Sequence, residues 1–318
     1  SMTTTGGFDI IGSGSMSGLG TFNLNGPVTW ISGNASNAGI TNMGGAVTLS
    51  GNGLRDISQR TINLSGTTTL TNAAGGNQGL TRLGSGAQLN NSGQFLDQTA
   101  LAMNFNDLGG GGTFGNTGTY TKTGVGTTNI GITFNNTGTV TVAAGTLTLS
   151  SAVPNNAGGT LTGGIWQVQG TGVLDFSLAN TSIATNAADI YLIGPSSVFR
   201  TRNAGGVQQT LDQTLSSNAA AGALRLQAGR TFNAIANSGN FSNAGILEVN
   251  DSTFTSATLA SNGVIASFGN STMTTGVGNR ITGTGSIASS FGTLTVSSGV
   301  NMGVGSICLL YTSPSPRD

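Results

Sequence analysis

A nine-residue segment recurs at a fixed interval in the middle of this chain. Residues 113–121 (TFGNTGTYT) return as residues 133–141 (TFNNTGTVT) and, in a weaker form, as residues 153–161. The fourth residue of each copy is an asparagine, Asn116, Asn136 or Asn156, so the interval is 20 residues each time. A fixed period of this size is typical of a solenoid, in which each repeat forms one coil and neighbouring coils share a core.

Within the repeat, apolar and hydroxyl side chains alternate. Residues 139–142 (TVTV) and 145–149 (GTLTL) have a period of two, which predicts strands with one dry and one wet face. The short intervening turns contain glycine and asparagine, which tolerate positive φ. The sequence therefore predicts an all-β protein. Its fold is expected to be a single right-handed parallel β-helix with coils of about 20–25 residues.

Stacked coils bring equivalent side chains over one another. We expect the amides of Asn116, Asn136 and Asn156 to form a structural ladder, bonding to each other and to turn carbonyls. Their role is predicted to be structural rather than ligand binding.

Outward-facing threonines are expected to stack in the same way. Thr119 and Thr139 would form one file, and Thr121 and Thr141 would form a second. Two regular files of hydroxyl groups make a flat surface array, which is one reason to consider ice binding as an alternative function.

Both ends of the chain carry sequence that we interpret as non-native. Ser1 and Met2 resemble the scar of a cleaved expression tag. Residues 308–318 (CLLYTSPSPRD) break the preceding composition, contain the only cysteine, and resemble a translated sequencing adapter. The solenoid is predicted to be one domain over residues 3–307, a fragment of a longer, metagenomic array. No apolar run is long enough to span a bilayer, and no signal peptide is visible.

Composition narrows the classes of function. Charged residues make up 6% of the chain, against about 25% in ordinary soluble domains, and the net charge is zero, which argues against nucleic-acid binding. The chain has no histidine, which removes catalytic triads and histidine-ligated metals. Its aspartates are scattered, with no paired carboxylates on one strand face. We therefore predict no catalytic residues, no metal site and no cofactor.

Two segments depart from the repeat. Arg55, Asp56 and Arg60 form a dense charge cluster, which we interpret as a salt-bridged turn between coils, with a ligand contact as the alternative. Residues 98–108 are predicted to be an irregular or briefly helical insertion.

Several motifs resemble bacterial surface β-strand-repeat proteins, which are autotransporter- or adhesin-like. The resemblance is carried by residues 60–63 (RTIN), 134–140 (FNNTGTV), 145–147 (GTL), 185–190 (TNAADI) and 217–222 (SNAAAG), and it covers nearly all of the chain. It implies a parallel β-helix, export and display at the cell surface.

From these observations we expect a non-catalytic structural or adhesive module of a secreted or cell-surface repeat protein. Its expected partners are glycans or other cell-surface molecules. Exposed strand edges at the end coils predict end-to-end self-association. An ice-binding solenoid, or one that binds or cleaves polysaccharides, is the alternative.

Overall fold

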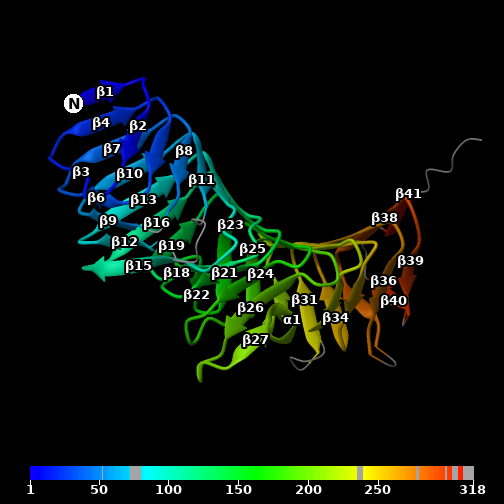
Figure 1. The fold of residues 1–318 in the computed structure, drawn as a ribbon. Coiled ribbons are helices and arrows are strands. Elements are labelled where there is room, and N and C mark those ends of the chain that lie inside the picture. Colours follow the sequence, from blue (N-terminus) through cyan, green and yellow to red (C-terminus); the bar gives the residue numbers. More distant parts are fainter. Residues whose placement is uncertain are drawn as a thin grey trace, which may run out of the picture. The chain divides into compact units, whose positions relative to one another are not determined.

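The computed structural model describes residues 1–51, 53–71, 80–234, 239–276, 279–297, 299–302 and 307–310. The fold is almost entirely β, with parallel coils stacked into a β-solenoid of about 12 turns (Figure 1). This confirms the predicted solenoid. The coils group into two compact units: unit 1 comprises Ser1–Asn155 with Thr171–Ala179, and unit 2 comprises Asn156–Gly170 with Asn180–Asp318.

Unit 1 has three faces, each a ladder of parallel strands that takes one strand from each coil. The first face, sheet A, contains β1 (Met2–Thr4), β4 (Thr21–Leu24), β7 (Ile40–Met43), β10 (Thr61–Leu64), β13 (Ala87–Asn91), β16 (Gly112–Asn116) and β19 (Thr133–Asn136). The second, sheet B, contains β2 (Phe8–Ile10), β5 (Val28–Trp30), β8 (Val47–Leu49), β11 (Thr67–Leu70), β14 (Gln94–Asp97), β17 (Thr119–Lys122) and β20 (Thr139–Val142). The third, sheet C, contains β3 (Ser15–Met16), β6 (Gly33–Ala35), β9 (Leu54–Ser58), β12 (Leu80–Gly84), β15 (Met103–Gly109), β18 (Thr127–Ile130), β21 (Thr146–Leu149) and β24 (Val173–Phe176).

The core of unit 1 is a narrow stack of side chains from alternate positions on the three sheets. Its centre is aromatic, with ring centroids 5.1 to 6.4 Å apart, and is made by Phe95, Phe105, Phe114, Tyr120 and Phe134. All five are fully buried. The register places Phe114 directly beside Phe134, so a phenylalanine of one coil packs on a phenylalanine of the next.

Unit 2 also consists of stacked strands, but its coils differ in length. Two long strands, β23 (Thr160–Gln169) and β25 (Thr185–Ile193), begin the main ladder. Each later coil divides the equivalent segment into two shorter strands. These pairs are β28 (Ser217–Asn218) with β29 (Ala223–Gln227), β31 (Asn240–Asn243) with β32 (Ile246–Asn250), β34 (Thr258–Ser261) with β35 (Val264–Phe268), β37 (Ile281–Gly283) with β38 (Ser286–Ser290), and β40 (Val300–Met302) with β41 (Ile307–Leu310).

The remaining elements of unit 2 lie on another face and at one extended turn. A four-stranded ladder contains β30 (Thr231–Asn233), β33 (Thr253–Thr255), β36 (Ser271–Thr274) and β39 (Leu294–Val296). An antiparallel excursion contains β26 (Val198–Arg202), β27 (Gln208–Thr210) and the single turn α1 (Leu211–Thr214). A short antiparallel strand, β22 (Asn156–Ala157), precedes β23.

Coil length varies around the predicted 20–25 residues: hydrogen-bonded ladder partners are 18 residues apart at Asn243 and Ser261, but 32 apart at Asn186 and Asn218. The predicted insertion at 98–108 is irregular over residues 98–102, as expected, but residues 103–108 belong to strand β15, which pairs with β12 and β18. Pairing with neighbouring coils outweighs the weak local pattern there.

The predicted non-native ends also take part in the ladders where they are described. Met2 belongs to β1 and pairs with Phe22. The backbone of residues 308–310 continues β41 alongside β38. The rest of the predicted tail, residues 311–318, lies outside the described residues.

Glycines at the turn from sheet A to sheet B form a column of close backbone approaches. A Cβ added to Gly118 would overlap the carbonyl oxygen of Gly93, and one added to Gly138 would overlap that of Gly118. Neither Gly118 nor Gly138 has positive φ. Glycine is therefore needed at these two positions for its missing side chain, which the stacking requires, and not for its tolerance of positive φ.

Candidate functional site

The buried corner of unit 1 holds a ladder of asparagine amides at the ends of β13, β16 and β19. Asn91 Nδ2 donates to Asn116 Oδ1 at 2.7 Å, and Asn116 Nδ2 donates to Asn136 Oδ1 at 2.8 Å. Each also donates to a carbonyl one coil further on, that of Thr119 or Thr139, at 3.0 Å. The predicted bond between Asn116 and Asn136 is thus present, and Asn91 extends the ladder.

The third predicted ladder position is occupied differently. Asn155, not Asn156, contacts Asn136: its Oδ1 accepts from the Asn136 backbone N at 2.8 Å, and its Nδ2 donates to the Asn136 carbonyl at 2.7 Å. Asn156 begins unit 2, where its Nδ2 donates to the Thr181 carbonyl at 2.7 Å. The chain passes from unit 1 to unit 2 between Asn155 and Asn156. The residue that contacts Asn136 is therefore one position earlier than predicted.

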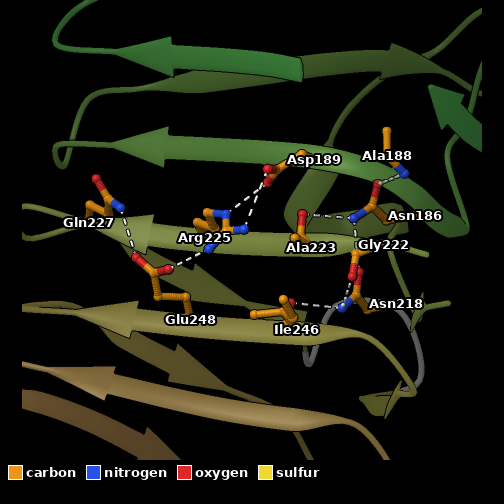
Figure 2. A network of polar contacts seen from close by, with 10 residues as sticks. All are labelled: Asn186, Ala188, Asp189, Asn218, Gly222, Ala223, Arg225, Gln227, Ile246 and Glu248. Atoms are coloured by element: carbon orange, nitrogen blue, oxygen red, sulfur yellow. Dashed lines mark hydrogen bonds and ion pairs between the residues drawn. The ribbon is translucent and has the colours of Figure 1, made fainter. Parts of the chain in front are cut away.

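A second buried ladder crosses unit 2 (Figure 2). Asn186 Nδ2 donates to Asn218 Oδ1 at 2.9 Å. Asn218 Nδ2 in turn donates to Asn243 Oδ1, outside the view of Figure 2, at 2.8 Å. Asn243 Nδ2 ends the series by donating to Ser261 Oγ at 3.0 Å. The same chemistry therefore holds the same kind of corner in both units, which supports a structural role for these amides.

The outer face of sheet A carries a separate, half-buried amide row. Asn42 donates to Asn23 at 2.8 Å, Asn63 to Asn42 at 2.9 Å, and Asn90 to Asn63 at 3.0 Å, all between side-chain amides. These amides use part of their hydrogen-bonding capacity on each other. The row is consequently less available to an external ligand.

The outer face of sheet B carries files of threonine, which we call the threonine face. One file contains Thr29, Thr48, Thr69, Thr121 and Thr141, with Leu96 between Thr69 and Thr121. The other contains Thr67, Thr119 and Thr139, with Gln94 between the first two. The predicted pairs Thr119–Thr139 and Thr121–Thr141 are confirmed in register, and the files are longer than the sequence repeat indicated.

The hydroxyl groups of the threonine face are free to bind an external molecule. Within the described residues of unit 1, none of them hydrogen-bonds to another protein group, and all are at least partly exposed. From β5 to β20, the described strands of sheet B also place no charged side chain on this outer face. The result is a neutral array repeating at about 4.8 Å along each file and about 6.7 Å between files.

A charged cluster lies on the outer face of unit 2 (Figure 2). Arg225 lies between Asp189, with Nε–Oδ1 at 2.9 Å, and Glu248, with Nη1–Oε2 at 2.6 Å. Its guanidinium carbon is 5.2 Å from the centre of the Tyr191 ring. Burial acts to lower the pKa of Arg225, but the hydrogen bonds to both carboxylates outweigh it and raise the pKa. These charges pair with one another across three coils.

The predicted salt-bridged turn at Arg55, Asp56 and Arg60 is wrong. Arg55 lies on β9 and Arg60 follows it; both side chains are buried inside unit 1. Arg60 donates to the Thr41 hydroxyl at 2.7 Å and to four backbone carbonyls, and burial lowers the pKa of Arg55 to about 10. Asp56 instead pairs outward with Arg82 at 2.7 Å. Strand alternation, rather than attraction within the cluster, decides where these charges point.

A polar cluster is sealed in the core of unit 1, between β14, β17 and β18. Both side chains of the pair Asp97 and Lys122 have zero solvent exposure, and Lys122 Nζ is 3.4 Å from each carboxylate oxygen. Asp97 Oδ2 accepts from the Tyr120 hydroxyl at 2.8 Å and the Thr128 hydroxyl at 2.5 Å. Asp97 Oδ1 accepts from the Thr99 backbone N at 3.1 Å and hydroxyl at 2.7 Å.

The surroundings of this cluster shift the proton affinities of its members. Burial lowers the pKa of Lys122, although the nearby Asp97 charge opposes that change. Burial also raises the pKa of Tyr120 well above its usual value, and the Asp97 charge adds to that effect. Both shifts disfavour the charged forms, as expected in a medium of low polarity.

No family model, curated protein or solved structure matches this chain. Among the described residues, no three potential metal ligands gather into a group that could hold an ion. No described helix has the length and apolar character needed to cross a membrane.

The functional interpretation of the sequence missed the sealed cluster. Its signal is nevertheless visible, because β17 reads Thr-Tyr-Thr-Lys and strand alternation puts Lys122 on the same inward face as Tyr120. The burial of Asp97 follows equally from β14. Their pairing across 25 residues could not be read from the 20-residue repeat, because the coil between them is longer.

Proposed function

We propose that this chain is a non-catalytic adhesive module of an extracellular, surface-displayed repeat protein, and that the threonine face is its binding surface. The observation that carries the proposal is the in-register array of unbonded, uncharged hydroxyl groups. The resemblance to surface β-strand-repeat proteins agrees with display outside the cell.

The chemistry of the threonine face suits neutral glycans. A polysaccharide presents repeating hydroxyl groups, which can donate to and accept from threonine hydroxyls. Each contact is weak in water, but a rigid file of them allows many contacts at once, so that avidity can exceed the affinity of any single contact. Because no charge is involved, binding should be insensitive to salt.

A glycan array followed by titration with the selected polysaccharide tests this proposal. Thr119→Lys should lower the affinity about tenfold or more by placing a bulky charge in the files. Thr127→Lys is the matched control, because Thr127 is an exposed strand threonine in the same coil but on sheet C. Equal loss in both variants, or no glycan binding by the wild-type chain, would contradict the assignment.

The register of the two threonine files also favours a second candidate, ice binding. A flat, rigid lattice of hydroxyl and methyl groups could order water against a crystal face. Thermal hysteresis and inhibition of ice recrystallisation measure this activity, and Thr119→Lys should abolish both while Thr127→Lys preserves them. Absence of thermal hysteresis at high protein concentration would rule out ice binding.

A further inference from the structure

Lys122 is the only lysine in the chain, and it is fully buried. A single amine enclosed with a single carboxylate is unusual, because taking both charges out of water costs several kcal/mol per ion in real proteins. Ionic pairing repays that cost only when the geometry is very good. Here the distances from Lys122 Nζ to the two Asp97 oxygens are both 3.4 Å, longer than the 2.7–2.9 Å of a strong charge-assisted bond, and the shorter contacts of Nζ are to the Thr99 and Thr128 hydroxyls, at 3.1 and 3.2 Å.

The geometry points to a covalent cross-link: the Lys122 amine and the Asp97 carboxyl condense into an intramolecular isopeptide bond. Nζ is equidistant from the two carboxylate oxygens, so it lies on the plane that bisects them and contains the carboxyl carbon. The amine is therefore in direct contact with the carboxyl group, and a neighbour fixed in this way can have an effective molarity of about 10⁵ M or more.

The condensation balances without any external reagent. One proton passes from the Lys122 ammonium to Asp97, which leaves a neutral amine beside a neutral carboxylic acid. The amine attacks the carboxyl carbon, the Nζ–Cγ bond forms, and the Cγ–Oδ1 bond breaks. Oδ1 departs as water with two protons that came from Nζ, and an uncharged amide remains where two charges had been.

The residues around the pair are suited to each of these steps. The aromatic core and the lowered pKa of Lys122 favour the neutral amine. The Tyr120 and Thr128 hydroxyls donate to Oδ2, where negative charge develops during attack. The Thr99 hydroxyl hydrogen-bonds to Oδ1, the departing oxygen. Tyr120 and Thr128 are therefore assigned as oxyanion donors.

Intact mass spectrometry of the purified, denatured chain tests the bond directly. The expected mass is that of the sequence less one water, and Lys122→Arg, which cannot form the amide, should show the full mass. Because the measurement is made on denatured protein, it does not depend on whether the variant folds. A full mass for the wild-type chain overturns the proposal.

A second measurement uses the uniqueness of Lys122. Under denaturing conditions, an amine-specific acylating reagent should label only the α-amino group of the wild-type chain, since the ε-amine is already an amide. Labelling of Lys122 in the denatured chain would contradict the bond. Proteolysis and fragmentation should yield a branched peptide that joins Asp97 to Lys122.

The assigned donor can be tested separately. In freshly synthesised protein, Tyr120→Phe retains both reacting groups but should form the bond about 100-fold more slowly, because one oxyanion donor is lost. Thr127→Ser, on the same strand as Thr128 but facing outward, is the control and should leave the rate unchanged. Equal rates in wild-type and Tyr120→Phe would remove Tyr120 from the chemistry.

Discussion

Asparagine carries two N–H donors and a carbonyl acceptor, so a buried asparagine is stable only where its partners are fixed in place. The ladders meet this condition by repetition: the middle amides, Asn116 in unit 1 and Asn218 in unit 2, accept from one coil and donate to the next. An asparagine in the ladder can therefore be replaced only by a residue whose side chain can both accept and donate a hydrogen bond. Ser261 ends the series in unit 2 with a hydroxyl, which accepts from Asn243.

Replacing the middle amide of the unit 1 ladder should be strongly destabilising. We expect Asn116→Ala to lower the free energy of unfolding by about 2–3 kcal/mol, since it leaves neighbouring buried amide groups without partners. Chemical denaturation followed by circular dichroism measures the change. Asn135→Ala, on the same sheet but exposed, should change it by less than about 0.5 kcal/mol. Similar losses in the two variants would show that the ladder carries no special stability.

The raised pKa of Tyr120 predicts how stability depends on alkaline pH. Its folded-state pKa lies above the unfolded value of about 10, so its contribution to stability is complete below pH 10 and is lost as pH rises further. The sign is the same whether Asp97 is a carboxylate or an amide, because burial is the larger cause. Denaturation midpoints from pH 8 upward should fall less steeply in Tyr120→Phe than in the wild-type chain. Buried Arg55, whose pKa is lowered, has the opposite effect on the pH dependence of stability, but it is present in both proteins and cancels in the comparison. Parallel plots of midpoint against pH for the two proteins would contradict the prediction.

At the scale of an element, the corner between sheets A and B depends on two features acting together. The buried asparagine holds the end of one strand, and the glycine two positions later lets the turns of adjacent coils approach closely. Neither feature alone explains the Asn-x-Gly motif. Glycine is required at this position because the backbone of the adjacent coil comes too close for a side chain, and not because of its own backbone angle.

This interpretation predicts a steric effect at Gly118. Gly118→Ala should destabilise unit 1 by at least about 2 kcal/mol, because the added methyl group overlaps the Gly93 carbonyl and the coils must move apart. Gly20→Ala is the control, since an added Cβ there meets no atom within 4 Å. Thermal unfolding of both variants measures the difference. A Gly118→Ala variant as stable as wild type would mean that the coils can separate at little cost.

At the scale of the whole molecule, the stacked strands leave hydrogen-bonding edges. In unit 1, β1 pairs with β4 on one side, and its other edge has no strand partner among the described residues. Such an edge is a template for another strand. We therefore expect the chain to associate edge to edge at high concentration.

Light scattering over a dilution series measures this association. Thr3→Lys, which adds a charge beside the β1 edge, should shift the association to higher concentration through repulsion between copies. Thr127→Lys adds the same charge on sheet C of a later coil and should not. Scattering that corresponds to a monomer at every concentration would be evidence against the association.

Strand alternation and the 20-residue repeat were enough to determine the solenoid, the inward and outward positions, the Asn116–Asn136 contact and the register of the threonine files. The inward and outward positions are local, because the period of two is built into the pleat of each strand. The contacts between coils could be predicted here because the repeat spacing of 20 residues is exact between Asn116 and Asn136. The tertiary structure alone decided that Asn155 rather than Asn156 contacts Asn136, which carbonyl and hydroxyl groups Arg55 and Arg60 bind, and that Asp97 meets Lys122. Contacts between coils depend on the length of every intervening turn, and those turns vary too much for a single repeat to predict which residues come together.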